Sequence, residues 1–245
     1  MSLNGISLRY AGRVDYRFLK KKLVCLTVIH MILVILLMPS VSALPIGVYH
    51  NHDNADNKIA LTFDDGPHPK YTMEILDILS EYDIPATFFF VGENVSYYQD
   101  TARAVVERGH EVGNHTYSHP CVKKQSQAAF REELIRCEDI IQRVVGVHPK
   151  LFRPPQGSWN TSVYEIARER EYSVILWDLD TLDWAHTPSE NISNYILENV
   201  KSGNIILMHD YHSGGCTTTD ALRMFIPNLI EQGYRFVTVS ELIGS

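Results

Sequence analysis

Hydrophobic residues after position 57 follow two alternating spacings. Short continuous apolar runs bounded by Gly, Pro or polar residues are typical of buried strands, and longer segments with apolar residues three or four positions apart are typical of amphipathic helices. The predicted strands cover 58–63, 86–92, 110–116, 150–155, 172–180, 204–210 and 234–242. The predicted helices cover 71–82, 101–109, 127–146, 162–171, 193–203 and 220–233.

This alternation, repeated about seven times, predicts a mostly parallel sheet with helices outside it, either closed as a barrel or open and doubly wound. In both arrangements ligands meet the carboxyl ends of the strands, so polar side chains there are expected to share one site. Such residues are Asp64 and Asp65 after the first strand, His115 after the third, Arg153 at the fourth, Asp180 after the fifth and His209 after the sixth.

The first 43 residues form a different kind of segment. A basic cluster, RFLKKK at 17–22, precedes an almost wholly apolar run at 23–38, and small residues follow at 41–43. This order is typical of a secretory signal, although an uncleaved anchor is an alternative because the run is only slightly short for a membrane span. We therefore expect a signal peptide or membrane anchor at 1–43, a polar linker at 44–56 and the main domain at 57–245.

Composition and charge limit the kinds of partner that the chain can bind. The chain of 245 residues is 45% hydrophobic, enough for one sizeable domain. Cleavage after residue 43 would remove six of its 22 basic residues and one of its 29 acidic residues, which leaves a net charge of −12. That charge argues against nucleic acid and polyanionic substrates and is compatible with a neutral glycan. We expect the domain to be secreted or tethered to the outer face of the cell membrane, with membrane contact only through an uncleaved N-terminal segment.

Cysteine usage gives no support for a cysteine-based zinc site. Cys25 lies in the apolar segment, and the chain has no CxxC pair. One disulfide and one free thiol could form outside the cell among Cys121, Cys137 and Cys216, and the sequence leaves the pairing open.

Residues 114–120 read NHTYSHP and carry two histidines four positions apart. On a helical turn, the imidazoles of His115 and His119 would project from one face, as two ligands of one metal must. With Asp64 and Asp65 on the same rim, one carboxylate can complete a His-His-Asp set that leaves coordination positions open, and the other can act beside it as a general base. Such a set suits one divalent ion: Zn²⁺, with Co²⁺ or Ni²⁺ as alternatives.

Five motifs, TFDDGP, HTYSH, RPPQG, DTLDW and IILMHD, occur in an order that resembles the polysaccharide deacetylase family, carbohydrate esterase family 4. That family includes chitin deacetylases, chitooligosaccharide deacetylases and peptidoglycan N-acetylglucosamine deacetylases. The resemblance covers about residues 57–242 and implies a distorted (β/α) barrel of about seven strands. It also implies metal-dependent hydrolysis of acetamide groups on N-acetylglucosamine units, which releases acetate.

The resemblance also implies a role for each matched residue. Asp64 resembles the catalytic base, and Arg153 resembles the arginine that holds it. The metal-binding residues would be Asp65, His115 and His119. His209 resembles the catalytic acid, with Asp183, or else Asp180, keeping its imidazole protonated. Trp184 and Leu207 resemble the apolar walls around the sugar and the acetyl methyl group.

Gln156 departs from the family pattern, which usually has Tyr after the two prolines. Its backbone N–H would still serve the oxyanion, but an aromatic wall of the sugar groove is lost. The motif TFDDGP favours N-acetylglucosamine over N-acetylmuramic acid, and export favours peptidoglycan or a chitin-like oligomer as the substrate.

Two other functions fit parts of the same pattern. An esterase that removes O-acetyl groups from xylan or another glycan would use the same residues. A non-catalytic glycan-binding protein on this fold would be expected to have lost part of the metal set, and this chain has kept all of it.

Overall fold

The sheet of the computed structural model is curled, and its ladders are all parallel across the described part of the chain, residues 45–53, 55–211 and 217–244. The strand order is β1-β6-β5-β4-β3-β2-β8-β7, and β9 pairs with β2. The strands are β1 (Val48–Tyr49), β2 (Lys58–Asp64), β3 (Thr87–Phe90), β4 (Glu111–Asn114), β5 (Leu151–Phe152), β6 (Ser173–Ile175), β7 (Leu179–Asp180), β8 (Ile205–His209) and β9 (Arg235–Phe236).

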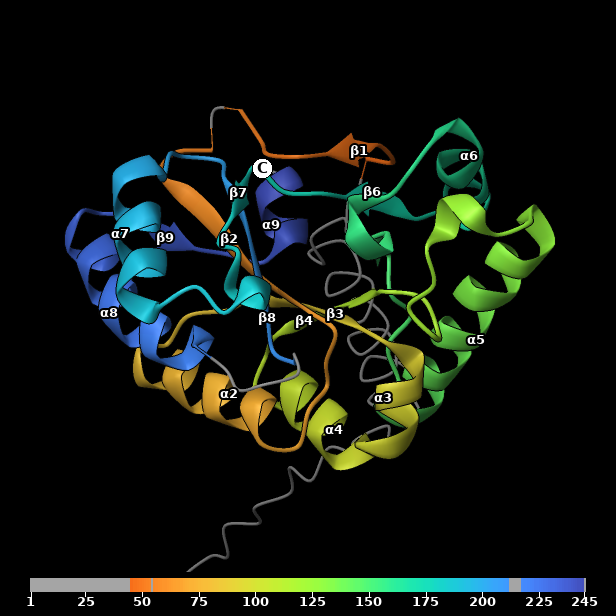
Figure 1. Cartoon of the computed structure of the whole chain (residues 1–245), viewed down its shortest axis with the longest axis horizontal. Coiled ribbons are helices and arrows are strands. Elements are labelled where there is room, and N and C mark those ends of the chain that lie inside the picture. The colour runs from red at the N-terminus through yellow and green to blue at the C-terminus, as the bar shows by residue number, and fades with distance from the viewer. Residues whose placement is uncertain (1–44, 54, 212–216, 245) are drawn as a thin grey trace, which may run out of the picture. The chain divides into compact units, whose positions relative to one another are not determined.

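Helices pack against this sheet, most of them on its outside (Figure 1). They are α2 (Tyr71–Glu81), α3 (Gly92–Tyr97), α4 (Gln99–Glu107), α5 (Gln127–Val145), α6 (Thr161–Glu169), α7 (Ser189–Asn199), α8 (Thr218–Glu231) and α9 (Val239–Ile243). The arrangement confirms the predicted distorted (β/α) barrel. No helix among these residues has both the length and the apolar character needed to cross a membrane. The predicted signal or anchor at 1–43 lies outside the described residues.

The barrel is distorted because β6 and β7 belong to opposite ends of the sheet. The sequence predicts one strand over 172–180, but β6 pairs with β1 and β5, whereas β7 pairs with β8. Only residues 176–178 connect them, so the two ends of the open ladder lie close together. Asp178 fixes this crossing, since its carboxylate accepts the Ile205 N–H.

Side chains of strand β2 contribute alternately to two hydrophobic cores, one on each face of the sheet. Ile59, Leu61 and Phe63 pack outward against the helices, and Ala60 packs inward. The inner core is completed by α9, which contributes Val239, Leu242 and Ile243. Because strand side chains alternate, Thr62 and Asp64 face the same interior as Ala60. Asp64, the last residue of β2, lies at the carboxyl end of the strands.

Two more predicted segments differ from the structure. The segment 44–56, expected to be a linker, adds β1, whose Val48 and Tyr49 pair with β6. The final segment, expected to be one strand over 234–242, ends as a strand at Phe236 and turns into α9. Thr238 caps this helix by accepting the Glu241 N–H, a Thr-x-x-Glu signal that ends the strand.

The described thiols are unpaired. Cys121 and Cys137 are free, and Cys137 is buried, where its thiol donates to the Phe90 carbonyl. Burial raises the pKa of the Cys137 thiol. Cys216 lies outside the described residues, so the predicted disulfide stays a prediction.

Candidate active site

The adjacent aspartates are held in different environments. Asp64, the last residue of β2, is 3% exposed, and its Oδ1 accepts a hydrogen bond from Arg153 Nη1 at 2.8 Å. Asp65 leaves the strand with a left-handed φ of 76°, which turns its side chain toward His115 and His119. Both carboxylates lie near His115, whose Nε2 is 3.6 Å from Asp64 Oδ2, but Arg153 bonds only to Asp64 and His119 faces only Asp65.

Arg153 is fully buried and holds the Asp64 carboxylate. Its Nη1 also donates to Thr62 Oγ1 at 2.7 Å, and its Nε and Nη2 donate to the carbonyls of Ile175 and Leu176. A buried guanidinium with each nitrogen bonded offsets the cost of burying the Asp64 charge. Its planar fork also fixes the direction of that carboxylate.

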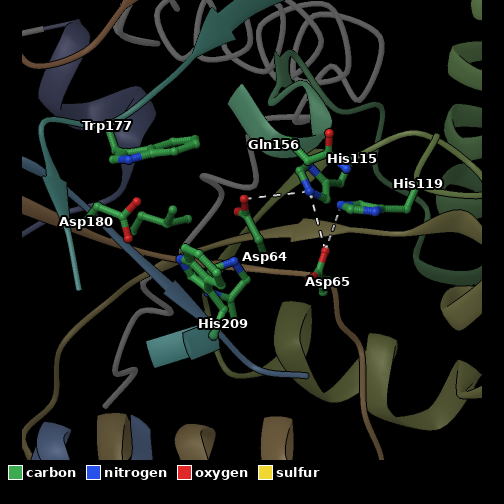
Figure 2. A pocket seen from close by; sticks show the side chains of 10 residues that line it. Asp64, Asp65, His115, His119, Gln156, Trp177, Asp180 and His209 are labelled. Atoms are coloured by element: carbon green, nitrogen blue, oxygen red, sulfur yellow. Dashed lines mark ion pairs between the residues drawn. The ribbon is translucent and has the colours of Figure 1, made fainter. Parts of the chain in front are cut away.

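Asp65, His115 and His119 form a cluster whose ligand atoms all lie within 4.8 Å of one another. Asp65 Oδ1 is 3.5 Å from His115 Nε2 and 3.2 Å from His119 Nε2. Figure 2 shows the two imidazoles turned toward this oxygen, with Asp64 beside them.

The two histidines do not share a helical turn, contrary to the sequence prediction. They lie in an irregular loop after β4, where Thr116 and His119 have left-handed φ values of 69° and 56°. Side chains hold this loop: Asn114 accepts the Thr116 N–H, and Thr116 Oγ1 accepts the His119 N–H. Left-handed backbone at non-glycine residues persists only where its surroundings fix it, as here.

This cluster fits a divalent metal ion. His115 Nδ1–H donates to the Arg153 carbonyl at 2.7 Å, so its Nε2 keeps a lone pair directed at the cluster. Asp65 Oδ1 is buried and has no hydrogen-bond partner among the described residues, as expected of an atom that binds a cation. Burial would raise the pKa of Asp65, but the imidazoles of His115 and His119 beside it outweigh burial and lower it to about 2.

His209 stands at the end of β8 with a carboxylate behind it. Its Nδ1–H donates to Asp183 Oδ1 at 2.8 Å, and Asp183 Oδ2 accepts the His209 N–H and the Thr218 hydroxyl. Burial lowers the pKa of an imidazole, but the hydrogen bond and charge of Asp183 outweigh it and raise the pKa of His209 to about 9. Asp180 instead accepts the Leu182 N–H, so the structure selects Asp183 from the two sequence candidates.

Removing the Asp183 charge is expected to shift the high-pH limb of the rate–pH profile of the enzyme. If His209 donates a proton, the rate should fall above about pH 9 as the imidazole deprotonates. In Asp183→Asn the pKa of His209 should fall toward the ordinary value of about 6.5, so the limb should move to lower pH. Rate–pH profiles of wild type, Asp183→Asn and the control Asp180→Asn test this. A limb that moves only in Asp180→Asn would contradict the assignment.

A pocket of about 350 Å³ joins these groups. Trp184 is 52% exposed at its edge, whereas Leu207 is buried in its wall, so the predicted apolar residues both line the pocket. Trp177 also lines it, and sequence analysis missed it because it stands in a run that reads as core strand. Figure 2 shows Trp177 and His209 at opposite sides of Asp64. Gly157 leaves room for the indole ring of Trp177, because a Cβ at position 157 would lie 2.9 Å from that ring.

Gln156 lines the same pocket with an exposed side chain. Its backbone is left-handed, with φ 59° and ψ 20°, in the short 3₁₀ turn Pro155–Gly157 that follows Arg153. Its N–H makes no hydrogen bond within the described part of the chain. The structure therefore brings together every residue that the sequence singled out for the site.

Comparisons with known proteins agree with this arrangement. Residues 51–175 match the profile of a family described as polysaccharide deacetylase. A peptidoglycan-N-acetylglucosamine deacetylase of Bacillus cereus is 41% identical over 192 residues, which cover 78% of this chain and 90% of the relative. The crystal structure of a peptidoglycan N-acetylglucosamine deacetylase bound to 4-naphthalen-1-yl-N-oxidanyl-benzamide has a TM-score of 0.78 at 34% identity, covering 81% of this chain and 93% of that chain.

Two further solved structures share the fold under other descriptions. A CE4 family pseudoenzyme from Bacillus anthracis has a TM-score of 0.75 at 31% identity, covering 80% of this chain and 68% of that chain. A family 4 acetyl xylan esterase from Clostridium thermocellum, in complex with a cobalt ion, has a TM-score of 0.71 at 34% identity, covering 76% of this chain and 90% of that chain. Deacetylases, an esterase and a pseudoenzyme thus share one fold, so the activity has to be argued from the site.

Proposed function

Because the chain belongs to the polysaccharide deacetylase family, we propose that it is a metal-dependent hydrolase that removes N-acetyl groups from N-acetylglucosamine units of an extracellular glycan, peptidoglycan or a chitin-like oligomer. The observation that carries the proposal is the convergence of three groups on one pocket. These are a carboxylate held by a buried arginine, a His-His-Asp cluster with an unpartnered buried oxygen, and a histidine backed by an aspartate.

In this proposal the residues divide the work of amide hydrolysis. A divalent ion held by Asp65, His115 and His119 would supply the positive charge that polarises the acetamide carbonyl. Asp64, kept ionised and oriented by Arg153, accepts the proton of the attacking water. A His-His-Asp set leaves coordination positions open, as catalytic metal sites do. Zn²⁺, Co²⁺ and Ni²⁺ all suit these three ligands.

Two other groups that line the pocket serve the leaving group and the oxyanion. His209, protonated because of Asp183, donates a proton to the departing nitrogen. The free N–H of Gln156 donates to the carbonyl oxygen as negative charge develops there. Leu207 and Trp184 contact the acetyl methyl group and the sugar, respectively.

The predicted signal or anchor at 1–43 places this reaction outside the cell in our proposal. Secreted or tethered protein would meet a wall glycan directly, and the acidic main domain would not be drawn to nucleic acid. The N-acetylated glycan is therefore the expected partner.

The competing functions predict different products. A panel of peptidoglycan, N-acetylglucosamine oligomers and acetylxylan, each incubated with the purified metal-loaded protein, separates them by the acetate released. We expect release from the first two, accompanied by free amines. Release from acetylxylan alone would favour the O-acetyl esterase, and release from none would favour a non-catalytic protein.

Gln156 offers a test of substrate preference. Gln156→Tyr should lower KM on N-acetylglucosamine oligomers by about 1 kcal/mol of binding or less, the scale of one aromatic contact. Both residues carry a Cβ, so the left-handed backbone should tolerate either, and kcat should stay nearly constant because uniform binding does not change the barrier. Steady-state kinetics of both proteins on one oligomer give the answer. Loss of turnover would mean that the Gln156 amide itself takes part in the reaction.

A further inference from the structure

A stack of aromatic rings is formed by residues that follow Asp65 and His209 closely in the chain. His68 stacks against Tyr71 at 4.7 Å with an interplanar angle of 19°, and against Tyr211 at 5.0 Å with an angle of 13°. No ring contact joins Tyr71 to Tyr211 among the described residues, so His68 lies between them. Neither the motifs nor the reaction uses these three rings.

Backbone contacts fix the ring at the centre of the stack. The N–H groups of Lys70 and Tyr71 both donate to His68 Nδ1. Burial and the charge of Lys70 lower the pKa of His68, so the ring is neutral and its proton resides on Nε2. This donor has no acceptor among the described residues. The stack therefore combines flat apolar faces with an available polar edge, which suits a sugar ring better than a charged ligand.

Buried hydrogen bonds hold together the two chain segments that carry the stack, one with His68 and Tyr71 and the other with Tyr211. Thr72, which follows Tyr71, donates its hydroxyl to Asp210 Oδ2 at 2.5 Å, and it accepts the His68 N–H at 2.7 Å. Asp210, which precedes Tyr211, is fully buried and donates its N–H to the Asp64 carbonyl. Gly66 permits this packing, because a Cβ there would lie 2.1 Å from the Asp210 carboxylate.

The same two segments carry the catalytic groups. His68 follows Asp65 by three residues, and Tyr211 follows His209 by two, so the stack stands on the two segments that lead away from the pocket, although none of its rings lines that pocket. Figure 1 shows the end of β8 and the loop that enters α2 on the same side of the domain. His68 covers one face of Tyr211, yet 41% of Tyr211 is exposed, so its ring is also open to solvent.

We propose that Tyr211, supported by His68 and Tyr71, is a binding subsite for a pyranose ring of the glycan strand, next to the unit that is deacetylated. The inference rests on the proposed function for the identity of its ligand. The faces of sugar rings carry apolar C–H groups that pack on flat aromatic rings, and the Nε2–H of His68 can donate to a hydroxyl. The subsite would favour polymeric over short substrates.

Kinetics on N-acetylglucosamine oligomers from the dimer to the hexamer test the subsite, with the full-length metal-loaded protein. Tyr211→Ala should raise KM on the longest oligomers by about two- to tenfold, the scale of one aromatic contact, with KM on the shortest oligomer and kcat nearly unchanged. Tyr211→Leu should behave like Tyr211→Ala because it keeps apolar bulk without a flat face. Tyr211→Phe should behave like wild type.

Tyr195→Ala is the matched control, because Tyr195 is 38% exposed on α7 and has no ring contact among the described residues. A KM for Tyr211→Ala and Tyr211→Leu equal to that of Tyr195→Ala at every length would overturn the subsite. So would an equal rise at every length accompanied by a fall in kcat, which would assign Tyr211 to the support of His209.

Failure of the proposed function would be recognised separately. If wild type releases no acetate from any oligomer, deacetylation is wrong, and calorimetric binding of the hexamer then decides the subsite. Weaker binding by Tyr211→Ala than by Tyr195→Ala would support the subsite, and equal binding would overturn it.

Discussion

Asp65→Asn is expected to lose both tight metal binding and acetate release, whereas Asp64→Asn should lose acetate release and keep the metal. Asp65 Oδ1 faces both imidazoles and has no hydrogen-bond partner in the part of the chain that the structure describes, so an amide there removes the anionic ligand. Asp64 Oδ1 is already bonded to Arg153, and loss of a general base lowers a rate by about 10²- to 10⁴-fold.

Metal content of the purified variants, determined beside their activity, tests this division. Asp180→Asn is the control, because Asp180 lines the pocket without contacting either histidine of the cluster. It should retain the metal. Equal metal loss in Asp64→Asn and Asp65→Asn would contradict the separate roles.

Arg153→Met should destabilise the protein by about 3–5 kcal/mol, because it leaves the Asp64 carboxylate buried without a countercharge. It also removes hydrogen bonds to Thr62 and to two carbonyls that connect β5 with the β6–β7 crossing. Activity should fall in the fraction that remains folded, since the base loses its fixed direction. Denaturant unfolding monitored by circular dichroism measures the loss.

The matched control is Arg168→Met, which breaks an exposed ion pair with Glu165 on α6. Such exposed pairs contribute little to stability because water and salt screen them, so this variant should unfold close to wild type. If Arg153→Met also unfolded within about 1 kcal/mol of wild type, Arg153 would not be the countercharge on which buried Asp64 depends.

Positions at strand ends were predictable because strand periodicity is a local signal. The apolar run before Asp64 predicts a buried strand, and parallel strands bring their carboxyl ends to one rim. His115 and His119 were placed at the right site for a partly wrong reason. The residues that bring their rings together are Asn114 and Thr116, whose side-chain hydrogen bonds stabilise an irregular loop that spacing alone does not reveal.

Other features depended on contacts that are distant in sequence. The sequence names Asp183 as the partner of His209 with Asp180 as a second candidate, and only the turn at Leu182, with φ 53°, shows that Asp183 is directed toward β8. Trp177 reads as a core residue because it ends the apolar run VILW at 174–177. Strand β1 was not predicted because its two residues are too few to show a hydrophobic alternation. Its stability comes from pairing with β6.

Acetate release from an N-acetylglucosamine oligomer, followed before chelation, after chelation and after addition of Zn²⁺, tests metal-dependent deacetylation most directly. The wild-type protein should release acetate in step with new free amines, stop when the metal is removed, and resume when Zn²⁺ is restored. A folded, metal-loaded protein that releases no acetate, or one that releases it at an unchanged rate after complete chelation, would contradict the assignment of Asp65, His115 and His119 to a catalytic metal.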